Sequence, residues 1–170
     1  MNTQLTTIKV IPANNSNIIN IAKLFDKYRV FYKKKSDLDG AIEFIKGRFT
    51  KKEAFIFAAY LNDMIVGFAQ VYPSFSSINM EKIYVLNDLF IDENFRRFGA
   101  GKALIQHVKI FAQNNKVNTI VLETSSNNST AKALYESFGF SKEIDTDHYS
   151  LVCGSTYELG SKSNITFNTH

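Results

Sequence analysis

The spacing of apolar positions changes along the first half of the chain, and each change marks a predicted element. Alternation with a period of two is typical of a strand, and recurrence at every third or fourth position is typical of a helix. Apolar residues recur at helical spacing from Ile18 to Tyr32 and again up to Phe49. In chain order, the pattern predicts a strand over 4–11, a helix over 18–32 and a second helix that ends at 49. Strands over 54–61 and 65–72 follow, and after a turn over 73–77 a further strand is predicted over 78–91.

The second half of the chain alternates between short apolar runs and amphipathic segments. Helical spacing covers residues 103–113 and, after an apolar run at 119–124, continues over 128–138. A further strand is expected from Phe140, and a last one over 149–152. Strands that alternate with helices in this order predict a mixed α/β sheet covered by helices.

Composition indicates one globular domain. The chain has 170 residues, of which 45% are hydrophobic and 21% charged, which is enough for one core. Its longest apolar runs are too short to span a bilayer, and its N-terminus lacks the pattern of a signal peptide. Cys153 has no partner for a disulfide, which suits a reducing, cytoplasmic location. Residues 1–153 are expected to form the domain, and the polar segment 154–170 a loosely structured tail.

The net charge of +4 is modest, and much of it gathers in the lysine clusters at 33–35 and 51–52. No basic stripe interleaved with aromatic residues and no helix-turn-helix pattern is present, so we expect no nucleic-acid partner. His107, His148 and His170 lack metal-ligand spacing, so we also expect no metal. No membrane partner is expected either.

Residues 96–102 (Arg-Arg-Phe-Gly-Ala-Gly-Lys) lie between the apolar run that ends at Ile91 and the predicted helix 103–113. Glycines let the backbone approach a ligand, the helix N-terminus carries a partial positive charge, and the arginines and lysine add formal charge. The turn therefore suits a phosphate or pyrophosphate. On this stretch alone, a basic surface turn without a ligand is an equal alternative.

The segment 128–140 (Asn-Ser-Thr-Ala-Lys-Ala-Leu-Tyr-Glu-Ser-Phe-Gly-Phe) has the features of a complete helix. Asn128 is a natural N-cap, and Gly139 suits the position just past the helix end. Between them, Ala131, Leu134 and further apolar residues follow one helix face.

Arg-x-x-Gly-x-Gly at 96–101, followed by Asn-x-x-Ala-x-x-Leu-Tyr-x-x-x-Gly-Phe at 128–140, resembles the GNAT superfamily of acyl-CoA-dependent N-acyltransferases. The resemblance covers roughly residues 5–152. It implies the GNAT fold, an α/β fold with a mixed central sheet of six to seven strands covered by about four helices. In that fold the fourth and fifth strands splay apart at a bulge. The resemblance also implies acetyl-CoA as co-substrate and direct transfer of its acetyl group within a ternary complex.

The cofactor contacts implied by the resemblance carry over position by position. The backbone of Leu89, Phe90 and Ile91 would pair with the pantetheine arm. The thioester end would meet Asn128, Ala131 and Tyr135. The pyrophosphate would be wrapped by the turn, namely by Arg96, Arg97, Phe98, Gly99, Ala100, Gly101 and Lys102.

Tyr135 is the candidate general acid. A phenol with a pKa of about 10 is neutral at pH 7 and can donate a proton to a leaving sulfur. In the resembling family, a tyrosine at this position stands beside the thioester sulfur. Because Tyr135 lies on the apolar face of its predicted helix, a plain core tyrosine is the alternative.

Asn87 and Asp88 interrupt an apolar strand, where polar side chains are costly unless they are paired or face a cavity. Relatives often have an acidic residue on this strand that reaches the acceptor amine, and several have glutamate where this chain has Asn87. Asparagine cannot take a proton, which leaves Asp88 or a water-mediated route, with Glu123 as a weaker third choice. A buried carboxylate bonded to backbone is an equal alternative for Asp88.

The acceptor would bind between the first two helices and the turn after Tyr72, near Asn87. The candidate contacts are Tyr28, Arg29, Tyr32 and Phe75, although core packing also explains most of the aromatic ones. An arginine among aromatic side chains favours a small amine that also bears a carboxylate, such as an amino acid. A polyamine-like acceptor would use Asp37 and Asp39, and a protein amine stays open.

Two functions of other classes compete with catalysis. A module that only senses acyl-CoA would keep the basic turn but lose Tyr135, which this chain has. A dinucleotide-binding domain would need a third glycine where this chain has Leu104. Exposed strand edges are compatible with a homodimer, an expectation taken by analogy with relatives.

Overall fold

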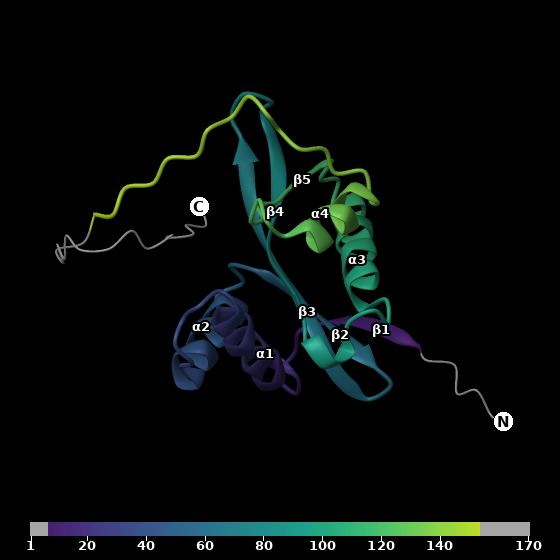
Figure 1. The fold of residues 1–170 in the computed structure, drawn as a ribbon. Helices are drawn as coiled ribbons and strands as arrows, with labels where there is room; N and C mark the ends of the chain where they lie inside the picture. Colours follow the sequence, from purple (N-terminus) through teal and green to yellow (C-terminus); the bar gives the residue numbers. More distant parts are fainter. Residues whose placement is uncertain (1–6, 154–170) are drawn as a thin grey trace.

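The computed structural model describes residues 7–153, which form one sheet with two α-helices on each face (Figure 1). The strand order is β1-β2-β3-β4-β5, antiparallel up to β4, with β5 parallel to β4. The strands are β1 Ile8–Pro12, β2 Phe55–Leu61, β3 Met64–Ser76, β4 Glu81–Ile91 and β5 Thr119–Val121. The helices are α1 Ile18–Phe31, α2 Leu38–Thr50, α3 Ala100–Asn114 and α4 Ser129–Glu136, with a short 3-10 turn at Glu93–Phe95.

Local side-chain chemistry sets the ends of two helices. Asp37 accepts a hydrogen bond from the Gly40 N–H at the start of α2 (3.0 Å), and Asn128 accepts one from the Ala131 N–H at the start of α4 (3.2 Å). These caps satisfy N–H groups that have no acceptor inside the helix. Gly139, just past α4, has a φ of +91°, a left-handed conformation that favours glycine.

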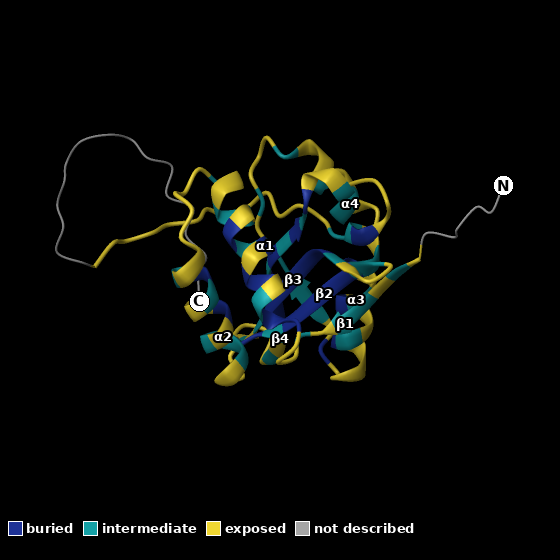
Figure 2. Cartoon of the chain, turned by 90° about the horizontal axis from the view of Figure 1, so that it is seen from below, coloured by how far each residue is buried: buried dark blue, intermediate teal, exposed yellow. Residues whose placement is uncertain are grey.

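The sheet separates two apolar clusters. Tyr84 and Leu86 of β4 pack in the cluster with α3 and α4, whereas Phe68 and Phe90 pack in the cluster with α1 and α2. Figure 2 shows buried residues concentrated along the central strands β2 and β3. Because helices cover both faces, these two strands are continuous apolar runs rather than alternating ones.

A β-bulge in the middle of β4 decides which face its side chains occupy. Gln70 of β3 pairs with Asp88, but the next residue, Val71, pairs with Leu86, so Asn87 is an extra residue on β4. Side chains alternate along a regular strand, and a bulge breaks this alternation. Leu86 therefore lies in the α3 cluster, whereas Asp88 lies on the α1 face.

β4 and β5 separate just before this bulge. β5 pairs with β4 only at Ile83–Val85, and the strand predicted over 119–124 ends at Val121. Within the described residues, the edge of β4 that faces β5 has no strand partner from Leu86 to Ile91. The splayed strands that the resemblance implied are confirmed.

The turn predicted over 73–77 is wrong, because β3 continues to Ser76. Proline lacks the N–H that a central strand needs, but it is tolerated where a strand has one free side. β2 ends at Phe55, opposite Val71, so Pro73 has only β4 beside it among the described strands.

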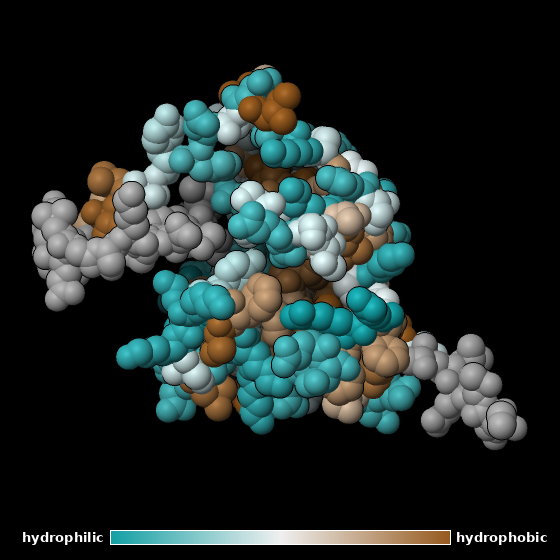
Figure 3. Space-filling view, in the orientation of Figure 1, coloured by the Kyte–Doolittle hydropathy of each residue, from teal (hydrophilic) through white to brown (hydrophobic). Residues whose placement is uncertain are grey.

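The end of the β3–β4 hairpin consequently projects beyond β2 (Figure 1). Its tip carries Ile78 and Met80, which are 94% and 91% exposed, and Figure 3 shows hydrophobic atoms there. The strand predicted over 78–91 begins later, at Glu81, because these tip residues have no neighbouring strand to pair with.

No strand forms between α4 and residue 153. The strands expected from Phe140 and over 149–152 are both absent, so the described sheet has five strands instead of six to seven. Tyr149 and Leu151 are 86% and 83% exposed. Alternating apolar residues specify a strand only where a sheet edge and a core receive them. The tail expected over 154–170 lies outside the described residues.

Candidate active site

Asp88 is 2% exposed on the α1 face of β4. Its Oδ2 atom accepts hydrogen bonds from Gln70 Nε2 at 2.8 Å and from Asn87 Nδ2 at 3.2 Å. The Tyr28 hydroxyl of α1 is a third donor. All three donors are neutral side chains, and within residues 7–153 no cation or backbone N–H contacts this carboxylate. The alternative of a carboxylate held by backbone is therefore not what the structure shows.

This neutral environment makes Asp88 basic. Burial raises the pKa of Asp88 to about 6 because desolvation disfavours the charged carboxylate. Hydrogen bonds from Asn87, Tyr28 and Gln70 lower the pKa but only partly offset burial. The carboxyl group is ionised at pH 7 and has a pKa close enough to 7 to take up a proton during a reaction.

Tyr28 lies in the last turn of α1, and Tyr32, the C-cap residue, follows one turn later, on the side facing Asp88. Their ring centroids are 4.9 Å apart, and the Tyr28 ring lies 5.9 Å from that of Phe90. Burial raises the pKa of both tyrosines, and the nearby Asp88 charge raises it further. Both hydroxyls therefore keep their protons at neutral pH; Tyr28 donates to the Asp88 carboxylate, and Tyr32 is hydrogen-bonded to Tyr28.

Tyr135 of α4 belongs to the cluster on the opposite face of the sheet. Its ring lies 5.9 Å from that of Phe140. Burial raises the pKa of Tyr135 to about 12, and the neighbouring Tyr32 adds to the shift. Tyr135 therefore remains protonated and lies close to Tyr32. Its phenol and the Asp88 carboxylate lie on opposite faces of the sheet, near the point where β4 and β5 separate.

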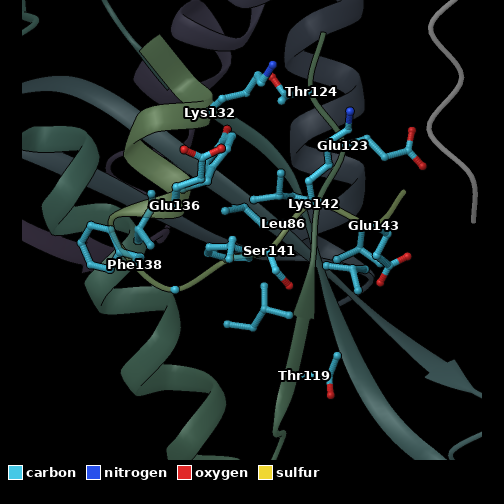
Figure 4. A pocket seen from close by; sticks show the side chains of 18 of the residues that line it. Leu86, Thr119, Glu123, Thr124, Lys132, Glu136, Phe138, Ser141, Lys142 and Glu143 are labelled. Atoms are coloured by element: carbon cyan, nitrogen blue, oxygen red, sulfur yellow. The ribbon is translucent and has the colours of Figure 1, made fainter. Parts of the chain in front are cut away.

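A cavity of about 910 Å³ opens between β5, α3 and α4 (Figure 4). It reaches β4 at Val85–Asn87, and Tyr135 lies in its wall. Lys132 and Glu136 of α4 line one side and Glu123 the other. Of the residues expected to bind the cofactor, Tyr135 alone lines this cavity, and the turn at 96–102 lies outside its wall.

Glu123 lacks the burial that distinguishes Asp88. Its side chain is 45% exposed, and its Oε1 atom lies 3.2 Å from Nδ1 of His148. An exposed carboxylate of this kind is solvated, so Glu123 lacks the desolvated setting of Asp88.

The turn at 96–102 carries a row of unpaired backbone N–H groups. Gly99 has a φ of +89° and precedes α3, and Arg97 also has a positive φ of +69°. The first hydrogen bond of the helix runs from the Ala103 N–H to the Gly99 carbonyl. The N–H groups of residues 97–102 find no acceptor within the described chain. Such a run of free N–H groups at a helix N-terminus is suited to an anion.

Gly101 brings this turn close to α4. A Cβ atom at position 101 would lie 3.2 Å from Leu134 Cδ2, so a larger residue would require the Leu134 side chain to shift. The free N–H groups of this turn, together with the charges of Arg97 and Lys102, therefore fit the pyrophosphate of acetyl-CoA.

The side chain of Arg96 points elsewhere. Its Nε donates to the Ile91 carbonyl at 3.3 Å, and its guanidinium carbon lies 5.7 Å from the centroid of the Phe31 ring. Arg96 thus links the turn to α1. The backbone expected to bind pantetheine, at Leu89–Ile91, lies on the unpaired edge of β4.

Asn128 and Ala131 are joined to each other. The Asn128 side chain caps α4 through the Ala131 N–H, so that N–H already has an acceptor. Both residues fix the start of the helix that carries Tyr135.

The predicted acceptor residues divide into two groups. Tyr28, Tyr32 and Asn87 gather around Asp88. Arg29 instead forms an ion pair with Asp26 at 3.3 Å, and Phe75 is 75% exposed near the hairpin tip.

Sequence reasoning missed Gln70. This fully buried residue donates to Asp88 and, at 2.7 Å, to the hydroxyl of Tyr72. It is a single polar residue within the apolar run of β3, which is the same signal that singled out Asp88.

Within residues 7–153, no helix is long and apolar enough to cross a membrane. The same part of the chain brings no three His, Cys, Asp or Glu side chains together in a way that could hold a metal ion.

Comparison with known families identifies this geometry. The family model described as the acetyltransferase (GNAT) family matches residues 21–140, well over half of the chain. The chain belongs to the GNAT acetyltransferase family. It is therefore an acetyl-CoA-dependent N-acetyltransferase.

Relatives of this GNAT enzyme span nearly the whole described chain. It is 41% identical to the uncharacterized N-acetyltransferase YhfO of Bacillus subtilis (strain 168), over 82% of this chain and 93% of the relative. A solved probable acetyltransferase has 32% identity and a TM-score of 0.80, over 87% of this chain and 99% of that one. An aminoglycoside N-acetyltransferase solved in complex with CoA shares the fold, with 17% identity and a TM-score of 0.76, over 90% of this chain and 100% of that one.

Proposed function

We propose that this GNAT enzyme transfers the acetyl group directly from acetyl-CoA to a primary amine of a small molecule, with both substrates bound together. The proposal rests on two groups near the point where β4 and β5 separate. One is the buried Asp88 carboxylate, which has no charged partner, and the other is the protonated Tyr135 phenol on the opposite face of the sheet. Acetyl-CoA supplies a thioester, and the amine attacks its carbonyl carbon.

Asp88 is the base in this scheme. A free alkyl amine has a pKa of about 10; its neutral fraction attacks the thioester, and the attacking nitrogen must then lose a proton to form the amide. Asp88 is ionised at pH 7 and can accept that proton, because burial has brought its pKa to about 6. Tyr28 and Asn87, which contact Asp88, would lie next to the amine.

Tyr135 is the acid. Its pKa of about 12 keeps the proton on the phenol until negative charge develops on the leaving sulfur. A hydrogen-bond donor aimed at that charge stabilises the transition state more than the ground state. Direct transfer is supported by the position of Cys153, the free thiol of the chain, in the exposed segment after α4.

The acceptor class follows from the charges around Asp88. Arg29, which would have bound a substrate carboxylate, is engaged by Asp26. The groups that gather at Asp88 are tyrosines and neutral amides, which suit a cation and supply no positive charge to pair with a substrate carboxylate. We therefore propose an alkyl amine or polyamine-like acceptor rather than an amino acid.

Tyr135→Phe tests the acid. We expect kcat to fall about 100-fold while the Kd of acetyl-CoA stays within about two-fold, because the proton donor is lost and the binding turn is intact. Thiol release with diamines, polyamines and amino acids measures kcat, and calorimetry measures Kd. Tyr149→Phe is the matched control, since Tyr149 is 86% exposed and should lose nothing.

Two results would count against this scheme. Unchanged turnover in Tyr135→Phe would remove Tyr135 from the mechanism. Thiol release with amino acids but not with amines that lack a carboxylate would overturn the proposed acceptor class.

A further inference from the structure

Asp88 has to release its proton after every turnover, yet it is 2% exposed. Two of its three hydrogen-bond partners, Gln70 and Asn87, are amides that donate through NH₂ groups. An amide NH₂ donates a hydrogen bond but does not give up its proton at neutral pH. The third partner, the Tyr28 hydroxyl, can donate one proton while it accepts another.

Tyr28 leads onward to a second hydroxyl. Tyr32, the C-cap residue of α1, follows one turn later with its ring centroid 4.9 Å away, and the two side chains are hydrogen-bonded. The Tyr32 N–H donates to the Tyr28 carbonyl at 3.2 Å, so the last turn of the backbone holds both side chains on the same face. Tyr32 is only half-buried, and it is close enough to Tyr135 to interact with it electrostatically.

We propose that Tyr28 and Tyr32 form a proton relay that carries the proton taken up by Asp88 to the cavity side, where Tyr135 stands. The inference rests on the proposed function and assigns these two tyrosines a role beyond contact with the acceptor.

The relay balances the reaction when the amine attacks in its neutral form. Asp88 takes a proton from the attacking nitrogen, and Tyr135 gives its proton to the departing thiolate. Asp88 then passes its proton to the Tyr28 oxygen, the Tyr28 proton moves to the Tyr32 oxygen, and the Tyr32 proton moves through water to the Tyr135 phenolate. One N–H bond is broken, one S–H bond is formed, and each residue regains its starting state.

The other branch from Asp88 does not offer an equivalent route. It runs through the Gln70 amide to the Tyr72 hydroxyl, near Arg48 and Glu53. The amide interrupts proton transfer there. The ionisable groups that face the relay are Asp88 on β4, Tyr28 and Tyr32 on α1, and Tyr135 on α4.

Tyr32→Phe is the test. The first turnover should proceed at the wild-type rate, because Asp88 starts ionised, whereas steady-state kcat should fall about 10-fold. The KM for acetyl-CoA should stay constant. Raising the imidazole concentration at fixed pH should restore kcat in the variant, because a small buffer can take over the missing hydroxyl. Wild type and Tyr60→Phe, a tyrosine of the same apolar cluster away from Asp88, should show no such rescue.

An equal loss in the first and later turnovers, without rescue, would assign Tyr32 to substrate positioning and overturn the relay, as would an unchanged kcat. If the variant does not fold, a proton inventory of the wild type in H₂O–D₂O mixtures decides: a curved plot supports several protons in flight, and a linear plot contradicts the relay. Wild-type protein that releases no thiol with any amine refutes the proposed function instead.

Discussion

Asp26 and Asp88 are both buried carboxylates, 8% and 2% exposed, but they meet different partners. Asp26, where α1 meets the start of α2, accepts hydrogen bonds from the Ser36 hydroxyl at 2.5 Å and the Asp37 N–H at 2.8 Å. It also pairs with the Arg29 guanidinium. Asp88 has only amides and a phenol.

Burial acts in the same direction on both carboxyl groups, and the donors decide the outcome. Burial tends to raise the pKa of Asp26, but hydrogen bonds from Ser36 and Asp37 and the charge of Arg29 prevail and lower it. The neutral donors at Asp88 offset burial only in part, and its pKa rises to about 6. A carboxylate whose cost of burial is offset by charged and backbone donors stabilises the fold. One whose cost of burial is only partly offset has a raised pKa and can accept a proton near neutral pH.

The largest expected effect is that of Asp88→Asn on activity. Asparagine keeps the shape and cannot take a proton, so kcat/KM should fall about 1000-fold. In wild type, kcat/KM should rise with pH through about 6 as the carboxyl group ionises, and the variant should lose this rise. Thiol release between pH 5 and pH 8 measures both. A variant with wild-type activity would exclude Asp88 as the base.

The same substitution should stabilise the protein at pH 7. A folded pKa of about 6 against an ordinary 3.8 means that ionising Asp88 opposes folding, by roughly 3 kcal/mol at about 1.4 kcal/mol per pKa unit. The gain should be present at pH 7 and vanish below pH 4, where the carboxyl group is protonated in both states. Urea unfolding at pH 7 and pH 3.5 measures it, and a loss of stability at pH 7 would contradict the assigned environment.

Asp26→Asn is the matched substitution and should do the reverse. It removes charge-assisted hydrogen bonds, so the free energy of unfolding should fall by about 2 kcal/mol at pH 7. Because the folded pKa of Asp26 is lowered below 3.8, this contribution exists above pH 4 and disappears as pH falls through the folded pKa. Activity per folded molecule should be unchanged; a loss like that of Asp88→Asn would break the comparison.

The smallest expected effect is that of Arg29→Met. This arginine is one of three partners of Asp26, and its side chain is 30% exposed, so its removal should cost about 0.5 to 1 kcal/mol. The KM for the acceptor amine should not change, because Arg29 faces Asp26. Urea unfolding and amine titrations at saturating acetyl-CoA measure the two quantities. A raised KM would return Arg29 to the acceptor site.

The features that the sequence predicted best are local ones. The basic glycine turn at 96–102 and the capped helix from Asn128 to Gly139 depend on neighbouring residues, and both form as expected. The strand expected over 149–152 would have needed a sheet edge and an apolar core distant in sequence, and the structure shows no strand at these residues. The turn predicted at Pro73 was wrong for the same reason. A proline is tolerated in β3 there because β2 ends before it, which the local sequence does not reveal.

The sequence by itself determined the fold class, the basic glycine turn suited to a phosphate and the residue types able to act as acid and base, because each depends on composition or on short spacing. Only the tertiary structure decided that Asp88 serves as the base candidate and that Asp26 is a fully paired carboxylate. The first outcome follows from the bulge at Asn87, which exists only through pairing with β3 and turns Asp88 toward Tyr28. The second follows from the contact of α1 with the start of α2, which brings the Ser36 hydroxyl and the Asp37 N–H to Asp26; its ion pair with Arg29 is a local contact within α1.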